Sequence, residues 1–176
     1  MSPRKSPPPP RQLILTTPEH LIAFGFGSGL SPVAPGTFGT LVGILLFLPL
    51  SLLDAQVYAA VVALLFAFGC WVCGESARLL GVHDHGGIVF DEIVGYLVAA
   101  APLTLFPDLT TVAFVGGLVL AFALFRLFDV CKPWPIGVLD RRVRGGFGIM
   151  LDDLLAGAFA ALPLWAALYG WTGVVS

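Results

Sequence analysis

The sequence predicts an all-α fold: a polytopic membrane helix bundle with about five transmembrane helices, preceded by an N-terminal interfacial or re-entrant segment. Of the 176 residues, 57% are hydrophobic and only 11% are charged, whereas soluble domains carry about 25% charged residues. The mean hydropathy is correspondingly high, at +0.93. The net charge of −2 excludes a strongly basic nucleic-acid-binding protein, so no nucleic-acid partner is expected.

The N-terminal end of the chain differs from the rest. Residues 1–17 contain a run of prolines between basic residues, and we expect them to form a disordered cytoplasmic arm, because they offer too little apolar surface to order. Residues 18–176 are expected to form one membrane-embedded domain. A short interfacial helix should begin near Pro18. The glycines and prolines that follow it, up to Thr37, are incompatible with an ordinary lipid-facing helix.

Five uncharged runs then define the expected helices. These runs are residues 39–53, 55–74, 93–107, 109–125 and 154–176. Some of them are shorter than the roughly 20 residues that a membrane-spanning helix needs, so flanking residues must join them. Extension adds charged residues to the ends of three helices: Asp91 and Glu92 to the third, Arg126 and Asp129 to the fourth, and Asp152 and Asp153 to the fifth.

The basic residues predict the orientation of these helices. With five spans, all nine Lys and Arg residues fall on or next to one side, and Asp54, Asp108 and the C-terminus fall on the other. The positive-inside rule therefore places the N-terminus in the cytoplasm and the C-terminus outside. The histidines and most of the acids share the cytoplasmic side.

Five carboxylates form the main candidate site, at the cytoplasmic ends of three helices. They are Asp91, Glu92, Asp129, Asp152 and Asp153. Acids at one membrane depth repel each other and need a counterion, and oxygen ligands favour a hard cation such as Mg²⁺. We therefore predict that these five residues are catalytic and bind metal. The alternative is that they are solvated helix ends that complement helix dipoles.

Basic residues beside the acids indicate a phosphate ligand. Arg126 and Asp129 are three residues apart and share a helix face, Lys132 follows closely, and Arg141 lies in the next loop. Carboxylates with a metal and nearby cations suit a phosphate monoester, so Arg126, Lys132 and Arg141 are candidate substrate-binding residues. For Arg141 and its basic neighbours, attraction to anionic lipid is the alternative.

Two loops add further candidates. The loop of residues 27–40 could cradle an anion with its backbone N–H groups, and we include its Ser31 and Thr37 among the substrate-binding candidates; close helix packing by small residues is the alternative. In the loop before the third helix, His83 or His85 could protonate a leaving group, or could act only as a loop cap.

At these residues the sequence resembles the phosphatidylglycerophosphatase A family. The resemblance covers residues 18–173, and the motifs occur in order without a departure. They include Val82-His83-Asp84-His85-Gly86, Asp91-Glu92, Phe125-Arg126-Leu127-Phe128-Asp129, Lys132-Pro133-Trp134-Pro135-Ile136 and Gly145-Gly146-Phe147-Gly148-Ile149-Met150-Leu151-Asp152-Asp153.

The resemblance implies Mg²⁺-dependent removal of the terminal phosphate from phosphatidylglycerophosphate, which gives phosphatidylglycerol in the bacterial inner membrane. The expected mechanism is in-line attack by a metal-bound water at the cytoplasmic end of the bundle, with the anionic lipid as substrate. The alternative function is a small ion or metal transporter with a carboxylate-lined path. Polar residues near the bilayer midplane, which such a path needs, are missing from the runs. The oligomeric state is left open.

Overall fold

The computed structural model describes residues 10–82 and 85–175, and every regular element within them is a helix. The prediction of an all-α fold is confirmed for this part of the chain. In chain order the elements are α1 (Arg11–Thr16), α2 (Pro18–Ala23), the 3-10 helix η1 (Gly25–Leu30), α3 (Pro35–Leu50), α4 (Ala55–Leu80), α5 (Phe90–Ala100), the 3-10 helix η2 (Ala101–Leu105), α6 (Thr111–Cys131), α7 (Ile136–Arg142) and α8 (Gly145–Val175).

Four of the five predicted runs lie largely within one helix each, whereas the third, residues 93–107, is divided between α5 and η2. The helices differ in length. Three are long and apolar enough to cross a membrane: Ala55–Leu80, Thr111–Cys131 and Gly145–Trp171. Helix α3 has 16 residues, and α5 has 11 before the chain continues as η2. Pro102 lies in η2, and the missing N–H of a proline helps to explain the end of α5. The number of five spans therefore stays a prediction.

Helix α5 is the centre of the bundle. It packs against α3, α4, α6 and α8, and most of its residues are buried. Two buried tyrosines fix its position: the Tyr58 hydroxyl on α4 donates to the Leu97 carbonyl (2.6 Å), and the Tyr96 hydroxyl donates to the Leu118 carbonyl on α6 (3.2 Å). Because α5 begins with Phe90-Asp91-Glu92, this packing carries two acids into the bundle.

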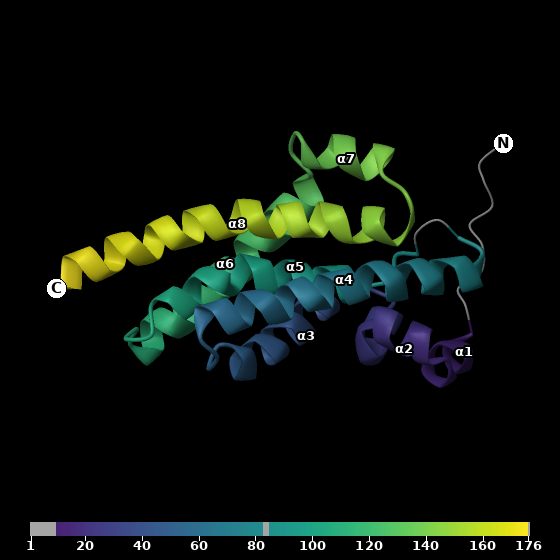
Figure 1. The fold of residues 1–176 in the computed structure, drawn as a ribbon, viewed down its shortest axis with the longest axis horizontal. Coiled ribbons are helices and arrows are strands. Elements are labelled where there is room, and N and C mark those ends of the chain that lie inside the picture. Colours follow the sequence, from purple (N-terminus) through teal and green to yellow (C-terminus); the bar gives the residue numbers. More distant parts are fainter. Residues whose placement is uncertain (1–9, 83–84, 176) are drawn as a thin grey trace.

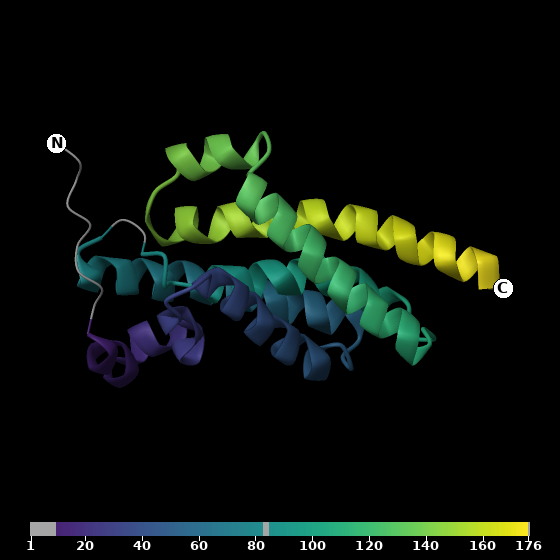
Figure 2. The ribbon, with the colours of Figure 1, turned by 180° about the vertical axis from the view of Figure 1, so that it is seen from behind.

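The bundle has two different ends (Figures 1 and 2). Helices α1, α2 and α7 lie toward the end where α4 finishes and α3 and α8 begin, and the C-terminus of α8 points the opposite way. The α3–α4 turn meets the segment between η2 and α6 at the other end, where residues of both line one cavity. Apart from Asp54 and Asp108, the charged residues that the structure describes are thus gathered toward the α7 end, as the sequence pattern predicts.

At the N-terminal end, the structure differs from the sequence expectation over residues 11–16. The prediction of disorder over residues 1–17 is wrong for residues 11–16, which form α1, and residues 1–9 lie outside the described part. Helix α1 orders because Ile14 is fully buried, so this short turn is stabilised by tertiary contact and not by its own length. Helix α2 begins at Pro18, where the sequence predicts a helix start.

Candidate active site

Three helices bring the five predicted carboxylates into one region of the α7 end. Asp91 and Glu92 are in the first turn of α5, Asp129 is in the last turn of α6, and Asp152 and Asp153 are in α8. Carboxylate oxygens of Asp91, Glu92 and Asp153 lie within 4.8 Å of one another. The Asp153 carboxyl also adjoins that of Asp129. Asp91 is held at the start of α5 by accepting the Glu92 N–H (3.1 Å), one of the free donors of a helix N-terminus.

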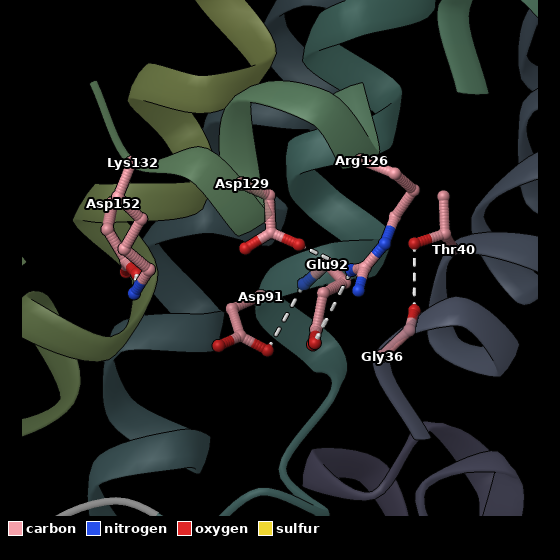
Figure 3. A network of polar contacts seen from close by, with 8 residues as sticks. All are labelled: Gly36, Thr40, Asp91, Glu92, Arg126, Asp129, Lys132 and Asp152. Carbon is pink, nitrogen blue, oxygen red and sulfur yellow. Dashed lines mark hydrogen bonds and ion pairs between the residues drawn. The ribbon is translucent and has the colours of Figure 1, made fainter. Parts of the chain in front are cut away.

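Arg126 connects α6 to the acids of α5 (Figure 3). Its Nη1 atom lies 2.5 Å from Asp129 Oδ2, one helical turn away, and 3.9 Å from Glu92 Oε1. The side chains of all three residues are at most one-fifth exposed. The guanidinium is thus fixed between two acids from different helices, and both ion pairs use the same nitrogen.

Lys132 makes a second cationic position on the other side of the cluster. Its Nζ donates to Asp152 Oδ2 (2.6 Å) and lies 3.2 Å from Asp140 Oδ1 on α7. Burial alone would lower the pKa of Lys132, but the hydrogen bonds and charges of Asp152 and Asp140 raise it above its usual value. Lys132 is therefore a permanent cation that holds the α6–α7 junction against α8.

The start of α3 forms a wall of the cluster. Gly36 is buried, and a Cβ atom built on it would overlap Glu92 Oε1 and approach Arg126 Nη1. The Thr40 hydroxyl is fully buried and donates to the Gly36 carbonyl (2.8 Å). The backbone of α3 therefore approaches these charged groups as closely as a residue without a side chain permits.

The charges and donors of the site fit a hard divalent cation. Six carboxylates, the five of the cluster and Asp140, face two cations, Arg126 and Lys132, which leaves four carboxylates uncompensated by these two residues when all are ionised. Glu92 Oε2 is buried and has no hydrogen-bond partner among the described residues. A buried acceptor without a donor is costly, and a cation bound by oxygen ligands would satisfy it. Asp91, Glu92 and Asp153 are the three acids placed to share such an ion.

The remaining predicted residues that the structure describes, Ser31, Thr37, His85 and Arg141, make no described hydrogen bond or ion pair with the five carboxylates. Ser31 donates to the Val33 carbonyl (2.8 Å), and His85 Nδ1 accepts the Gly87 N–H (3.0 Å); both residues line a separate cavity of about 380 Å³. Thr37 is half-buried in the first turn of α3, and Arg141 is exposed on α7. His83 lies outside the described residues. The contacts of His85 within its own loop favour the loop-cap alternative.

The site residues named from the sequence do not include Gly36, Thr40 and Asp140, although Gly36 and Thr40 lie in the loop of residues 27–40 that is a candidate anion-binding loop. Gly36 has a signal in retrospect, because Gly36, Gly39 and Gly43 lie on one face of α3. A Cβ on Gly36 or Gly43 would meet residues of α5, and one on Gly39 would meet Val89, which directly precedes α5. This spacing is typical of close helix contact in membranes. Asp140 carries no such signal, since its partner Lys132 is defined only by the fold.

Fold and site together define a helical membrane protein with a buried acidic site flanked by cations. The family model described as phosphatidylglycerophosphatase A matches residues 21–168. The chain therefore belongs to the phosphatidylglycerophosphatase A family, whose members are phosphatases of phosphatidylglycerol synthesis.

Three relatives show how far the similarity extends. Phosphatidylglycerophosphatase A of Haemophilus influenzae is 43% identical over 162 residues, which cover 92% of this chain and 95% of the relative. The Escherichia coli protein of the same name is 42% identical over 166 residues, covering 94% and 92%.

A Bacteroides thetaiotaomicron protein, named provisionally as a phosphatidylinositol-3-phosphatase, is 38% identical over 146 residues, covering 80% of this chain and 87% of the relative. No solved structure matches the chain. The apolar helices and the bacterial relatives indicate a bacterial membrane protein.

Proposed function

We propose that this protein removes the terminal phosphate of phosphatidylglycerophosphate at the cytoplasmic face of a bacterial inner membrane, and that it does so with Mg²⁺. The observation that carries the proposal is the group of three carboxylates within 4.8 Å, Asp91, Glu92 and Asp153, with two fixed cations beside it. Oxygen-only ligands favour Mg²⁺ among common cations, and the two matching relatives are named for this lipid phosphatase activity.

Different residues of the site would bind the metal and the phosphate. Asp91, Glu92 and Asp153 would hold the metal, which when bound neutralises phosphoryl charge and lowers the pKa of water. Arg126 has five N–H donors, and because both of its ion pairs use Nη1, the other nitrogens remain to bind phosphoryl oxygens. Asp129 orients that guanidinium. Asp152 and Asp140 hold Lys132, which adds positive potential at the phosphate without bidentate geometry.

Phosphate release from detergent-purified protein tests this proposal. We expect release from phosphatidylglycerophosphate to stop in EDTA and to return with Mg²⁺. Asp153→Asn should lower turnover by about 10² or more, by analogy with loss of a main electrostatic contribution. The Asp108→Asn variant, at the opposite end of the bundle, is the matched control and should keep full activity.

The substrate assignment is tested with the same preparation. Phosphatidylinositol 3-phosphate, the lipid in the Bacteroides relative's name, serves as the competing substrate and should be hydrolysed more slowly. Full activity in EDTA would contradict the metal site, and a preference for the inositol lipid would contradict the substrate.

A further inference from the structure

A groove runs between α4 and α8, away from the acidic cluster. The two helices touch closely near the cluster, where Gly69 faces Met150 and Gly74 faces Gly146. Farther along, they leave a cavity of about 640 Å³ whose floor is formed by α5 and η2. Its α4 wall includes Ala55, Ala59 and Ala63, which are four residues apart and therefore on one helix face.

The chemistry of the groove selects a wholly apolar occupant. The lining contains two hydroxyls, of Tyr58 and Thr104, and the indole of Trp165. Both hydroxyls donate to backbone carbonyls, of Leu97 and Ala101 respectively. No hydroxyl of the lining is thus left to recognise a polar ligand. Helices α4 and α8 are both candidate membrane spans, so the surroundings of the groove are hydrocarbon.

The dimensions of the groove match an acyl chain. Its α4 wall extends from Ala55 to Phe66, which at 1.5 Å per residue is about 16 Å. One leaflet is half of a hydrocarbon core of about 30 Å, so a lipid chain extends about 15 Å. The volume also lies within the usual range for small-molecule sites, about 300–1,000 Å³.

The groove begins close to the acidic cluster. Leu154, in its α8 wall, directly follows Asp153, and Val98 in its floor is seven residues, about 10 Å, beyond Asp91 on α5. In phosphatidylglycerophosphate, a glycerol, a phosphate and a second glycerol separate the terminal phosphate from the acyl chains. A substrate whose terminal phosphate reaches the cluster would therefore place a chain at the start of the groove.

We infer that the groove between α4 and α8 binds one acyl chain of the lipid substrate and makes the enzyme selective for long chains. The inference rests on the proposed function and adds a chain-recognition site to it. Filling the groove should weaken the use of long-chain substrate without changing the chemistry at the carboxylates.

Two neighbouring alanines give a matched pair of variants. Ala59 lines the groove and Ala60 does not, although both are exposed residues of α4. Ala59→Phe should raise KM for dipalmitoyl phosphatidylglycerophosphate in mixed micelles by about tenfold, because several methylene contacts are lost. It should leave the dihexanoyl substrate unchanged. Ala60→Phe should behave as wild type with both.

A cross-linking experiment on the unmodified protein is independent of how the variants fold. Substrate with a photoreactive diazirine at the end of one acyl chain should label α4 between residues 55 and 66 and α8 between residues 154 and 165. Phosphatidylethanolamine with the same diazirine chain should label these segments much less.

The possible results distinguish a failure of the acyl-chain inference from a failure of the proposed function. Equal labelling by the two lipids would mean that bulk lipid fills the groove and would overturn the inference, as would identical kinetics of Ala59→Phe and Ala60→Phe. Failure of the wild-type protein to hydrolyse phosphatidylglycerophosphate of either chain length would instead contradict the proposed function.

Discussion

At the scale of single residues, Arg126 is the most informative position, because one nitrogen reaches acids on two helices. We predict that Arg126→Lys loses nearly as much kcat/KM as Arg126→Ala, about 10²–10³. A compact ammonium cannot keep Asp129 and Glu92 in place and also present a planar fork to a phosphate.

The control for Arg126 is Arg142, which is exposed on α7. Arg142→Ala should mainly raise KM, and more so at low salt, because the interactions of exposed charges are screened. The kinetics of the three variants at two ionic strengths check this. An Arg126→Lys enzyme with more than half of the wild-type activity would show that the fork is dispensable.

The residue scale also shows what a sequence can and cannot predict about a site. Asp91, Glu92 and Asp129 lie at helix ends, as the lengths of the apolar runs predict, so their place in the cluster could be predicted. Asp152 and Asp153 were expected at the start of the fifth helix, but α8 already begins at Gly145 and carries them about two turns inside it. The separate roles of the acids within the cluster could not be predicted. Asp152 and Asp153 are adjacent and point about 100° apart on a helix, and only the packing of α8 decides that Asp152 meets Lys132 while Asp153 meets Asp91 and Glu92.

At the scale of elements, the approach of α3 to α5 makes a testable contribution to the site. A Cβ on Gly36 would overlap Glu92 Oε1, so we predict that Gly36→Ala displaces Glu92, lowers activity at least tenfold and destabilises the fold by about 1–3 kcal/mol.

Gly116 on α6 is the matched glycine, because nothing lies within 4 Å of a Cβ built there. Gly116→Ala should change stability by less than about 1 kcal/mol and should keep activity. Phosphate release and thermal unfolding in detergent measure both effects. Equal behaviour of the two variants would mean that the close approach of α3 has no role at the site.

The contact between α2 and α4 predicts that the stability of the fold depends on pH. His20 is buried, and its Nδ1 lies 2.8 Å from the buried Ser76 Oγ. Burial lowers the pKa of His20, partly offset by the charge of Glu19. The unfolded chain therefore takes up a proton below about pH 6.5 that the folded chain resists. The stabilisation by neutral His20 is present above that pH and is lost as the pH falls through the folded-state pKa.

His20→Asn removes this titration and tests the assignment. We expect the wild-type Tm to fall between pH 7 and pH 5, and the variant to show a smaller fall from a lower starting Tm, because its contact with Ser76 is weaker. Melting curves at several pH values measure both slopes. Parallel slopes in the two proteins would assign the pH dependence to other groups.

The elements themselves were predictable to the extent that their sequences were long and apolar. Helices α4, α6 and α8 follow directly from their runs. Helix α1 did not, because its six residues show no helical period of their own and are ordered by the burial of Ile14. The short length of α5 was also not predictable, since a buried central helix and a lipid-facing one have the same apolar composition.

At the scale of the whole molecule, the distribution of charged residues along the sequence and the fold place the same helix ends on the same side of the bundle. Asp54 and the residues that flank Asp108 line one cavity at the end opposite α7. The acids of α5 begin at the α7 end, and η2 finishes beside the α3–α4 turn. Helix α5 and η2 together therefore carry the chain from one end of the bundle to the other, although α5 alone is too short to span a membrane.

This path leads to a prediction of topology. Reporter fusions after Arg78 and Arg142 should give cytoplasmic signals, and fusions after Asp54, Asp108 and residue 176 should give signals from the opposite side. The reason is that every Lys and Arg among the described residues lies on or next to the α7 end, and positively charged loops stay in the cytoplasm. The decisive fusion is the one after Asp108, because it reports most directly whether α5 and η2 complete a crossing. A cytoplasmic signal there, with an outside signal after Asp54, would make α5 a re-entrant segment and would leave an even number of spans, with the C-terminus in the cytoplasm.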